Sequence, residues 1–189
     1  SWKMKRLIQW ESKHELNCFR LLDACAAVIE FYEQPLTINY MFDGICLKHF
    51  PDVLVKFDYS TELWEIKETN KINDSIVKKR TDFLVKELPR FGYKYRLVTD
   101  KELALEPRLK NARTMLRYGK FDYSKKDDES FRRLINSYQI NNLSWSKLGF
   151  EGKQILARKF LDGEINFNIN APLCSETTFS KNTGISFWE

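Results

Sequence analysis

The sequence predicts an α/β fold: a mixed sheet flanked by helices, followed by a small and mostly helical C-terminal domain. Apolar residues recur at helical spacing before and after a series of strand-like runs. Those runs are short, rich in β-branched and aromatic residues, and separated by turn residues. Helix, strands, helix and strand in this order describe a sheet with helices packed against it. The composition, 43% hydrophobic and 30% charged, suits a soluble globular protein and not a disordered one.

The first predicted element is a helix over residues 11–23, ESKHELNCFRLLD. Leu16, Phe19 and Leu22 repeat at helical spacing, and Glu15 shares their side because it precedes Phe19 by one helical turn. A carboxylate on the apolar side of a helix points to a functional role. Glu11, one turn earlier, is the alternative carboxylate, but the alignment with the apolar residues favours Glu15.

Strands are predicted next, over residues 28–33, 37–42, 45–49, 53–57 and 63–67. Asp43-Gly44 joins the second and third of these runs and is a strong hairpin signal. In the last run, LWEIK, the period of two places Glu65 and Lys67 on one face of the sheet. Asp52 stands at the entrance of the preceding run, and the short turn between the two runs makes them neighbours.

A second helix, capped by Asn73 or Asp74, is predicted to run to about Leu88, and a strand over residues 93–99 follows it. Pro107 marks the end of this domain, so we expect domains at residues 1–108 and 109–189. The second domain is predicted to contain helices over residues 109–117, 129–139 and 148–161, a polar loop over 120–128 and a strand over 165–169. Short helices that end in a strand are compatible with a winged-helix-like domain.

Charge and cysteine usage narrow the class of protein. The net charge of +5 permits a nucleic-acid partner without requiring one. The four cysteines form neither a CxxC pair nor a zinc-finger spacing, which fits the reducing cytoplasm. No run of about 18 apolar residues is present, so no membrane span is expected.

The informative motif is Pro51-Asp52, followed by Glu65-x-Lys67 on the next strand. Hydrolysis of a phosphodiester needs a divalent cation, and Mg²⁺ is satisfied by one or two carboxylates, waters and the substrate phosphate. Asp52 and Glu65 can supply the carboxylates, with Mn²⁺ able to substitute for Mg²⁺, and Lys67 can polarise the attacking water. A Glu and a Lys on a strand can also be a solvated sheet face. The placement of the motif on adjoining strands, after a helix that carries Glu15, favours a nuclease of the PD-(D/E)xK type with a restriction-endonuclease-like sheet.

Beyond this motif, the chain resembles the N-terminal nuclease domain of TnsA, the endonuclease subunit of heteromeric transposases. The resemblance is carried by Glu15, by Tyr32-Glu33-Gln34-Pro35-Leu36-Thr37-Ile38, by Phe50-Pro51-Asp52-Val53-Leu54-Val55 and by Trp64-Glu65-Ile66-Lys67. The Glu-Gln-Pro segment is the most specific part, because the chemistry does not require it. Residues 98–103 and 163–168 also resemble the family, and the likeness is strongest over residues 11–103.

The resemblance implies a bacterial, cytoplasmic protein that nicks one DNA strand at each transposon end during cut-and-paste transposition. Its implied partners are the DNA of those ends, a TnsB-type transposase that cuts the other strand, and a TnsC-type AAA+ regulator bound by the C-terminal domain. Carried over by position, Glu15, Asp52, Glu65 and Lys67 match the catalytic residues, with Glu15, Asp52 and Glu65 as metal ligands. Some members have Gln where this chain has Glu65.

Several other readings stay open. His49, three residues before Asp52, could act as a base, although this chemistry does not need a histidine. The cations Lys71, Lys78, Lys79, Arg80 and Lys86 could contact phosphates or form a solvated face. The rival functions are a stand-alone restriction or repair nuclease, and a catalytically silent adaptor between a transposase and an AAA+ regulator.

Overall fold

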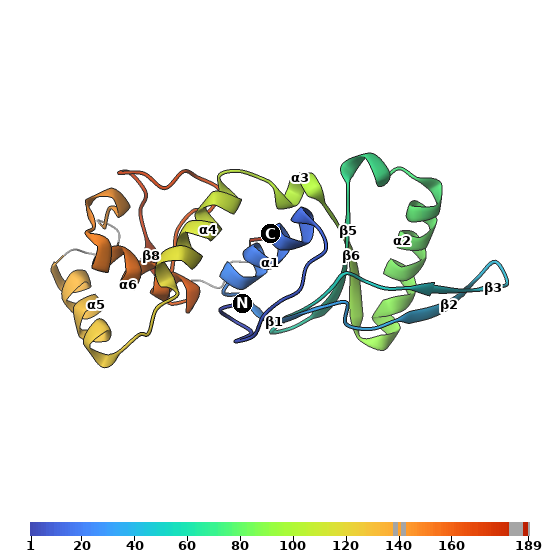
Figure 1. Cartoon of the computed structure of the whole chain (residues 1–189), viewed down its shortest axis with the longest axis horizontal. Coiled ribbons are helices and arrows are strands. Elements are labelled where there is room, and N and C mark those ends of the chain that lie inside the picture. Colours follow the sequence, from blue (N-terminus) through green and yellow to red (C-terminus); the bar gives the residue numbers. More distant parts are fainter. Residues whose placement is uncertain (138–139, 141–142, 182–186, 189) are drawn as a thin grey trace. The chain divides into compact units, whose positions relative to one another are not determined.

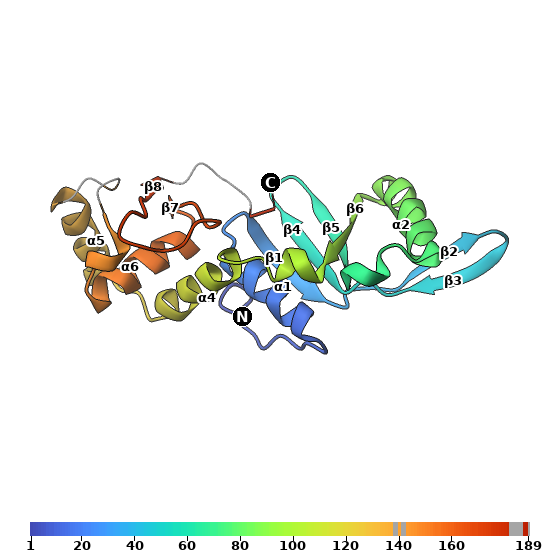
Figure 2. The same cartoon turned by 90° about the horizontal axis from the view of Figure 1, so that it is seen from above.

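The computed structural model describes residues 1–137, 140, 143–181 and 187–188. The chain forms two compact units. The first contains residues 3–19 and 28–104 together with Ser1, and the second contains residues 20–27 and 105–189 together with Trp2. Figures 1 and 2 together label the main helices and strands of both units. No helix in the described part of the chain is long and apolar enough to cross a membrane.

The first unit is built on a four-stranded mixed sheet in the order β1-β4-β5-β6 (Figure 2). Its strands are β1 (Val28–Glu33), β4 (Val53–Phe57), β5 (Thr61–Lys67) and β6 (Tyr93–Thr99). The β1–β4 and β4–β5 pairs are antiparallel, whereas β5 and β6 are parallel and are joined through helix α2 (Ser75–Glu87). The predicted mixed sheet with flanking helices is therefore confirmed, and α2 begins after the expected cap Asp74, whose carboxylate accepts from the amides of Ile76 and Val77.

Apolar side chains cover both faces of this sheet. On one face, Phe19 of helix α1 (Lys13–Ala24) stacks on Phe31 of β1 with the ring centroids 5.8 Å apart. On the other face, Leu63 of β5 and Tyr95 of β6 form a buried cluster with Leu84 and Leu88. A one-residue shift in register would exchange the side chains of the two faces, so the different apolar sets that pack on each face hold the register.

The hairpin β2 (Ile38–Phe42) and β3 (Ile45–His49) forms a separate two-stranded sheet that extends beyond α2 (Figure 1). Phe42 pairs with Ile45, and the turn residues Asp43 and Gly44 have φ values of 50° and 78°. Two positive φ values in a two-residue loop define a type I′ turn, as the Asp-Gly signal predicts. Phe83 of α2 anchors the hairpin through Tyr40 and Phe42, at centroid distances of 5.3 and 5.7 Å.

The Glu-Gln-Pro segment closes the end of β1 against the start of β4. Gln34 adopts a left-handed backbone conformation with a φ of 41°, and its amide donates to the carbonyl oxygen of Asp52 at 2.9 Å. A non-glycine residue in this region costs of order 1–3 kcal/mol, and a following proline disfavours it further. The segment therefore contributes a strained turn that fixes the backbone of Asp52.

The second unit contains three main helices, α4 (Arg108–Gly119), α5 (Lys125–Ser137) and α6 (Phe150–Leu161), and a two-stranded sheet of β7 (Ile165–Asn166) and β8 (Ser180–Lys181). Helices α4 and α6 approach closely at Gly119, where a Cβ atom would lie 2.7 Å from Leu161 Cδ1 and 2.9 Å from the carbonyl carbon of Ala157. The expected helical C-terminal region is confirmed. Other short elements in the described part of the chain include α3 (Asp100–Leu103), η1 (Thr69–Lys71) and η2 (Leu88–Phe91) in the first unit and η4 (Trp145–Lys147) in the second.

Two boundaries in this unit differ from the prediction. Residues 125–128, expected in a polar loop, form the first turn of α5, because Asp127 accepts from the amide and hydroxyl of Ser124 and caps the helix. The predicted end of that helix, residues 138–139, lies outside the described residues. The strand expected over 165–169 ends at Asn166, since Asn168 begins a turn in which its side chain accepts from the amide of Asn170.

The strained turn generates a stability prediction. Gln34→Val should lower the free energy of unfolding by roughly 1 kcal/mol or more, because a β-branched residue tolerates positive φ poorly. Gln34→Gly should be neutral or stabilising, since glycine adopts this conformation without steric cost. Both variants lose the same amide side chain, so the comparison isolates the backbone. Denaturant unfolding measures the difference, and equal stability of the two variants would contradict the strain.

Candidate active site

Adjacent antiparallel strands bring the two predicted carboxylates to one end of the sheet. Val53 of β4 pairs with Trp64 of β5, so Asp52 and Glu65 occupy the next positions along the same ladder. The Asp52 carboxylate accepts from the amide of Ile66 at 2.6 Å, which fixes its direction toward β5. Lys67, two residues beyond Glu65 on the same face, places its Nζ 2.7 Å from Glu65 Oε1. The structure thus brings Asp52, Glu65 and Lys67 together.

Glu65 is the most enclosed of these groups, at 3% exposure. Its Oε1 contacts both Lys67 Nζ and, at 3.2 Å, an Nη atom of Arg80 from α2. Its Oε2 lies 3.5 Å from Nε2 of His49, and that nitrogen is 2.9 Å from the hydroxyl of Tyr95. Burial lowers the pKa of His49, so the imidazole is neutral near neutral pH. His49 is therefore a buried neighbour of Glu65, and the contact made by Arg80 is a feature that sequence reasoning missed.

The environment of Asp52, including the charge of Glu65, disfavours its ionised form. Burial raises the pKa of Asp52 to about 6, and the negative charge of Glu65 adds to this rise. The hydrogen bond from Ile66 and the charge of Lys67 act in the opposite direction. Glu15 contributes a smaller upward effect. A carboxyl group with a perturbed pKa beside a second carboxylate and a lysine is typical of functional sites.

Glu15 also caps the N-terminus of helix α1. Its Oε2 accepts from the amide of Glu11 at 2.9 Å, its Oε1 accepts from the hydroxyl of Ser12 at 2.8 Å, and its own amide donates to that hydroxyl. Ser12-x-x-Glu15 is a capping-box pattern at the start of α1, and it is readable from the sequence. Glu15 acts on Asp52 through its charge, while both of its oxygens are engaged at the helix terminus. The alternative Glu11 accepts from the side-chain amide of Gln34 at 3.5 Å.

The donor set suits a hard divalent cation. Among the described residues, no three His, Cys, Asp or Glu side chains are arranged as a metal-holding group. Asp52 and Glu65 nevertheless offer carboxylate oxygens from neighbouring strands, and Mg²⁺ is commonly held by one or two carboxylates while it keeps several waters. A bound cation would offset both the burial and the repulsion from Glu65 that raise the pKa of Asp52. The residues present therefore fit such an ion.

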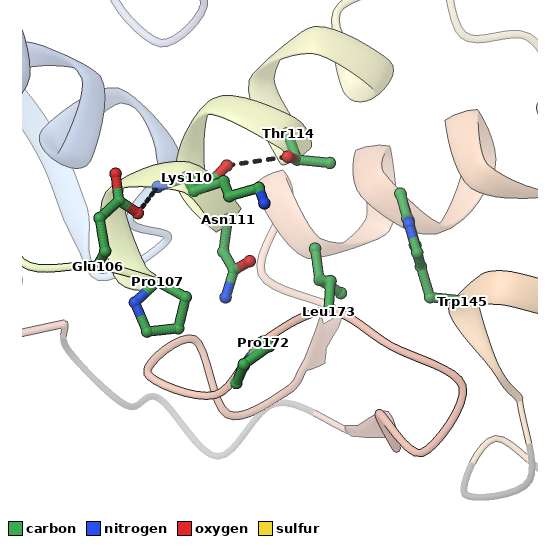
Figure 3. A pocket seen from close by; sticks show the side chains of 8 residues that line it. All are labelled: Glu106, Pro107, Lys110, Asn111, Thr114, Trp145, Pro172 and Leu173. Atoms are coloured by element: carbon green, nitrogen blue, oxygen red, sulfur yellow. Dashed lines mark hydrogen bonds between the residues drawn. The ribbon is translucent and has the colours of Figure 1, made fainter.

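The second unit holds a pocket of different character (Figure 3). It has a volume of about 570 Å³ and is lined by Glu106, Pro107, Lys110, Asn111, Thr114, Trp145, Pro172 and Leu173. Its polar groups are largely engaged with backbone: the Asn111 amide donates to the carbonyls of Ile169 and Ala171, and Glu106 accepts from the amide of Lys110. The lining lacks a carboxylate pair beside a lysine on facing strands, so this pocket does not offer the chemistry of the Asp52 site.

Comparison with known families finds a similarity, which covers most of the first unit. Residues 25–113 match the family model described as TnsA-like endonuclease N terminal. The matched segment includes the whole mixed sheet, α2, Asp52, Glu65 and Lys67, whereas Glu15 precedes it. No curated protein matches the chain.

The raised pKa of Asp52 predicts a pH-dependent cost to the metal-free fold. Asp52 has a pKa near 3.8 in the unfolded chain and about 6 in the folded protein, so the folded protein binds the Asp52 proton more tightly. The protonated carboxyl group therefore stabilises the fold fully below about pH 3.8, and this stabilisation is lost as the pH rises through about 6. Asp52→Asn keeps an acceptor for Ile66 and removes the charge. It should raise the thermal unfolding midpoint in EDTA at about pH 7.5 and have a smaller effect at about pH 4. If the unfolding midpoints of Asp52→Asn and the wild-type protein differ by the same amount at both pH values, the raised pKa of Asp52 is contradicted.

Proposed function

We propose, from the similarity of residues 25–113 to the TnsA-like endonuclease N-terminal family, that this chain is the metal-dependent DNA-cutting subunit of a heteromeric transposase. It nicks one strand at each transposon end during cut-and-paste transposition. The observation that carries the proposal is the convergence of Asp52, Glu65 and Lys67 at one end of the β4–β5 ladder. A stand-alone restriction or repair nuclease would use the same site, but the family match favours a transposase subunit.

In this proposal Asp52 and Glu65 hold Mg²⁺, which Mn²⁺ can replace, and Glu15 supports the site through its charge. The ion, when bound, activates water and offsets the charge that develops at phosphorus. Lys67 orients the attacking water and donates to a phosphate oxygen, because its flexible side chain, 30% exposed, starts beside the carboxylates. Water adds to phosphorus, the bond to the 3′ oxygen breaks, and that oxygen takes up a proton. The products are a 3′-hydroxyl and a 5′-phosphate.

The domain at residues 109–189 is proposed to serve partner or DNA contact and to take no part in the cutting chemistry. Its proposed partners are the TnsB-type transposase, which cuts the opposite strand, and the TnsC-type AAA+ regulator. The net charge of +5 is compatible with DNA contact. We place the protein in the bacterial cytoplasm, where these components and the DNA meet.

Lys67→Ala tests the chemistry. Strand cleavage by the assembled transposase should fall by about 100-fold or more, because a donor to the charged transition state is lost. Lys94→Ala, which removes an exposed lysine from the neighbouring strand β6, is the matched control and should cut normally. Nicking of an end-bearing DNA substrate is measured on denaturing gels, and undiminished cleavage by Lys67→Ala would refute the proposed site.

The same variant separates an enzyme from a silent adaptor. Crystals of Lys67→Ala soaked in Mn²⁺ should show anomalous density between Asp52 and Glu65, because the carboxylates remain in place. An adaptor would show no such density in the variant or in the wild-type protein.

A further prediction concerns target choice. The chain carries no obvious sequence-reading motif, so recognition of the transposon ends should come from its partner. The purified chain alone should cut without sequence preference or not at all, and addition of the TnsB-type subunit should restrict cleavage to the ends. Cut positions can be mapped on plasmid DNA with and without the partner. Site-specific cleavage by the chain alone would favour the stand-alone nuclease.

A further inference from the structure

One oxygen of Glu65 faces two cations at once. Lys67 approaches Oε1 from the same strand at 2.7 Å, and Arg80 approaches it from helix α2 at 3.2 Å. Transfer of a carboxylate from water to the protein interior has a large free-energy cost unless an opposite charge lies beside it. The charge of Lys67 also acts on the neighbouring carboxylate Asp52, so Lys67 is shared between two anions. Arg80 contacts Glu65 and can therefore have a separate role.

The two cations differ in how they can move. Lys67 has a compact ammonium on a flexible stem, and its side chain is 30% exposed. The Arg80 side chain is less exposed, at 22%, and it starts from a helix that is packed on the sheet through Leu84. The Nε atom of Arg80 is buried and has no hydrogen-bond partner among the residues that the structure describes. An arginine placed there only for its own hydrogen bonding would be expected to satisfy this donor.

We propose that Arg80 is a positioning residue that stays on Glu65 and so frees Lys67 to act on water and phosphate. This inference rests on the proposed nuclease function. While Arg80 keeps Glu65 neutralised and in place, Lys67 can leave Oε1 without exposing an unpaired buried anion. When Arg80 is absent, Lys67 is the remaining side-chain cation on Glu65 in the described part of the chain, and its departure becomes less favourable even where a bound ion offsets part of the charge. Arg80 therefore acts on the reaction through Glu65 and not by touching the DNA.

A double-mutant cycle between Arg80 and Glu65 tests this role. Arg80→Gln should lower the single-turnover cleavage rate by about 10–100-fold, as is typical when a residue that supports a site ligand is lost. The KM for DNA should change little, because no phosphate contact is removed. In the Glu65→Gln background the anion that Arg80 contacts is gone, so Arg80→Gln should lower the rate by less than about threefold there. Arg80→Lys, which retains the charge, should recover part of the rate.

Lys79→Gln is the matched control, because it removes an exposed charge from the preceding position of the same helix. It should leave the catalytic rate unchanged, and any effect should be confined to the KM and its salt dependence. The proposal is overturned if Arg80→Gln behaves like Lys79→Gln. It is also overturned if Arg80→Gln slows cleavage by the same factor in both Glu65 backgrounds.

A second readout is independent of cleavage. In metal-free protein, Arg80→Gln should lower the thermal unfolding midpoint more in the wild-type background than in the Glu65→Gln background. Additive effects would show that Arg80 does not neutralise Glu65 and would overturn the inference. If the wild-type protein fails to cut DNA even with its TnsB-type partner present while this coupling is observed, the proposed function fails and the pairing of Arg80 with Glu65 stands.

Discussion

The antiparallel register between β4 and β5 is the constraint on which the candidate site depends. It pairs Val53 with Trp64 and therefore sets Asp52 beside Glu65 at the end of the ladder. A slip of one residue would send one of these carboxylates to the opposite face of the sheet. The register is held because both faces are buried: Val53, Val55 and Trp64 pack on one side, and Leu63 packs against α2 on the other. Ordinary hydrophobic packing thus determines the geometry of the charged groups.

Those charged groups are placed at an energetic disadvantage. Asp52 and Glu65 are drawn out of water beside each other, and the raised pKa of Asp52 reports the conflict. Cations from two different elements, Lys67 on β5 and Arg80 on α2, lessen it. The strained turn at Gln34 adds a further cost close to Asp52. Local instability of this kind is common where a protein prepares a site for a ligand, and the surrounding core offsets it.

The strands and the two helices of the first unit follow from the sequence, because alternation, helical spacing and the Asp43-Gly44 turn all act locally. The proximity of Asp52, Glu65 and Lys67 was also predictable from adjoining strands. The capping task of Glu15 could have been read from Ser12-x-x-Glu15. The sequence presents Arg80 as one of five cations that could contact phosphates or form a solvated face, although it lies one turn before Leu84 and shares its inward side. In the second unit, the two-residue pairing of β7 with β8 could not be predicted, because it depends on a contact between segments that are distant in the sequence.

The parallel pairing of β5 with β6 has a consequence for how such a chain can vary. Parallel neighbours cannot be joined by a tight turn, so the chain must cross over through α2, and both of its connections are short. Lengthening either connection would rotate or translate the whole helix and carry Arg80 away from Glu65. The type I′ loop of the β2–β3 hairpin is not part of the β5–α2–β6 crossover, because that hairpin belongs to a separate sheet. Insertions at the hairpin tip therefore leave the site in place, whereas insertions at either end of α2 disrupt the contact between Arg80 and Glu65.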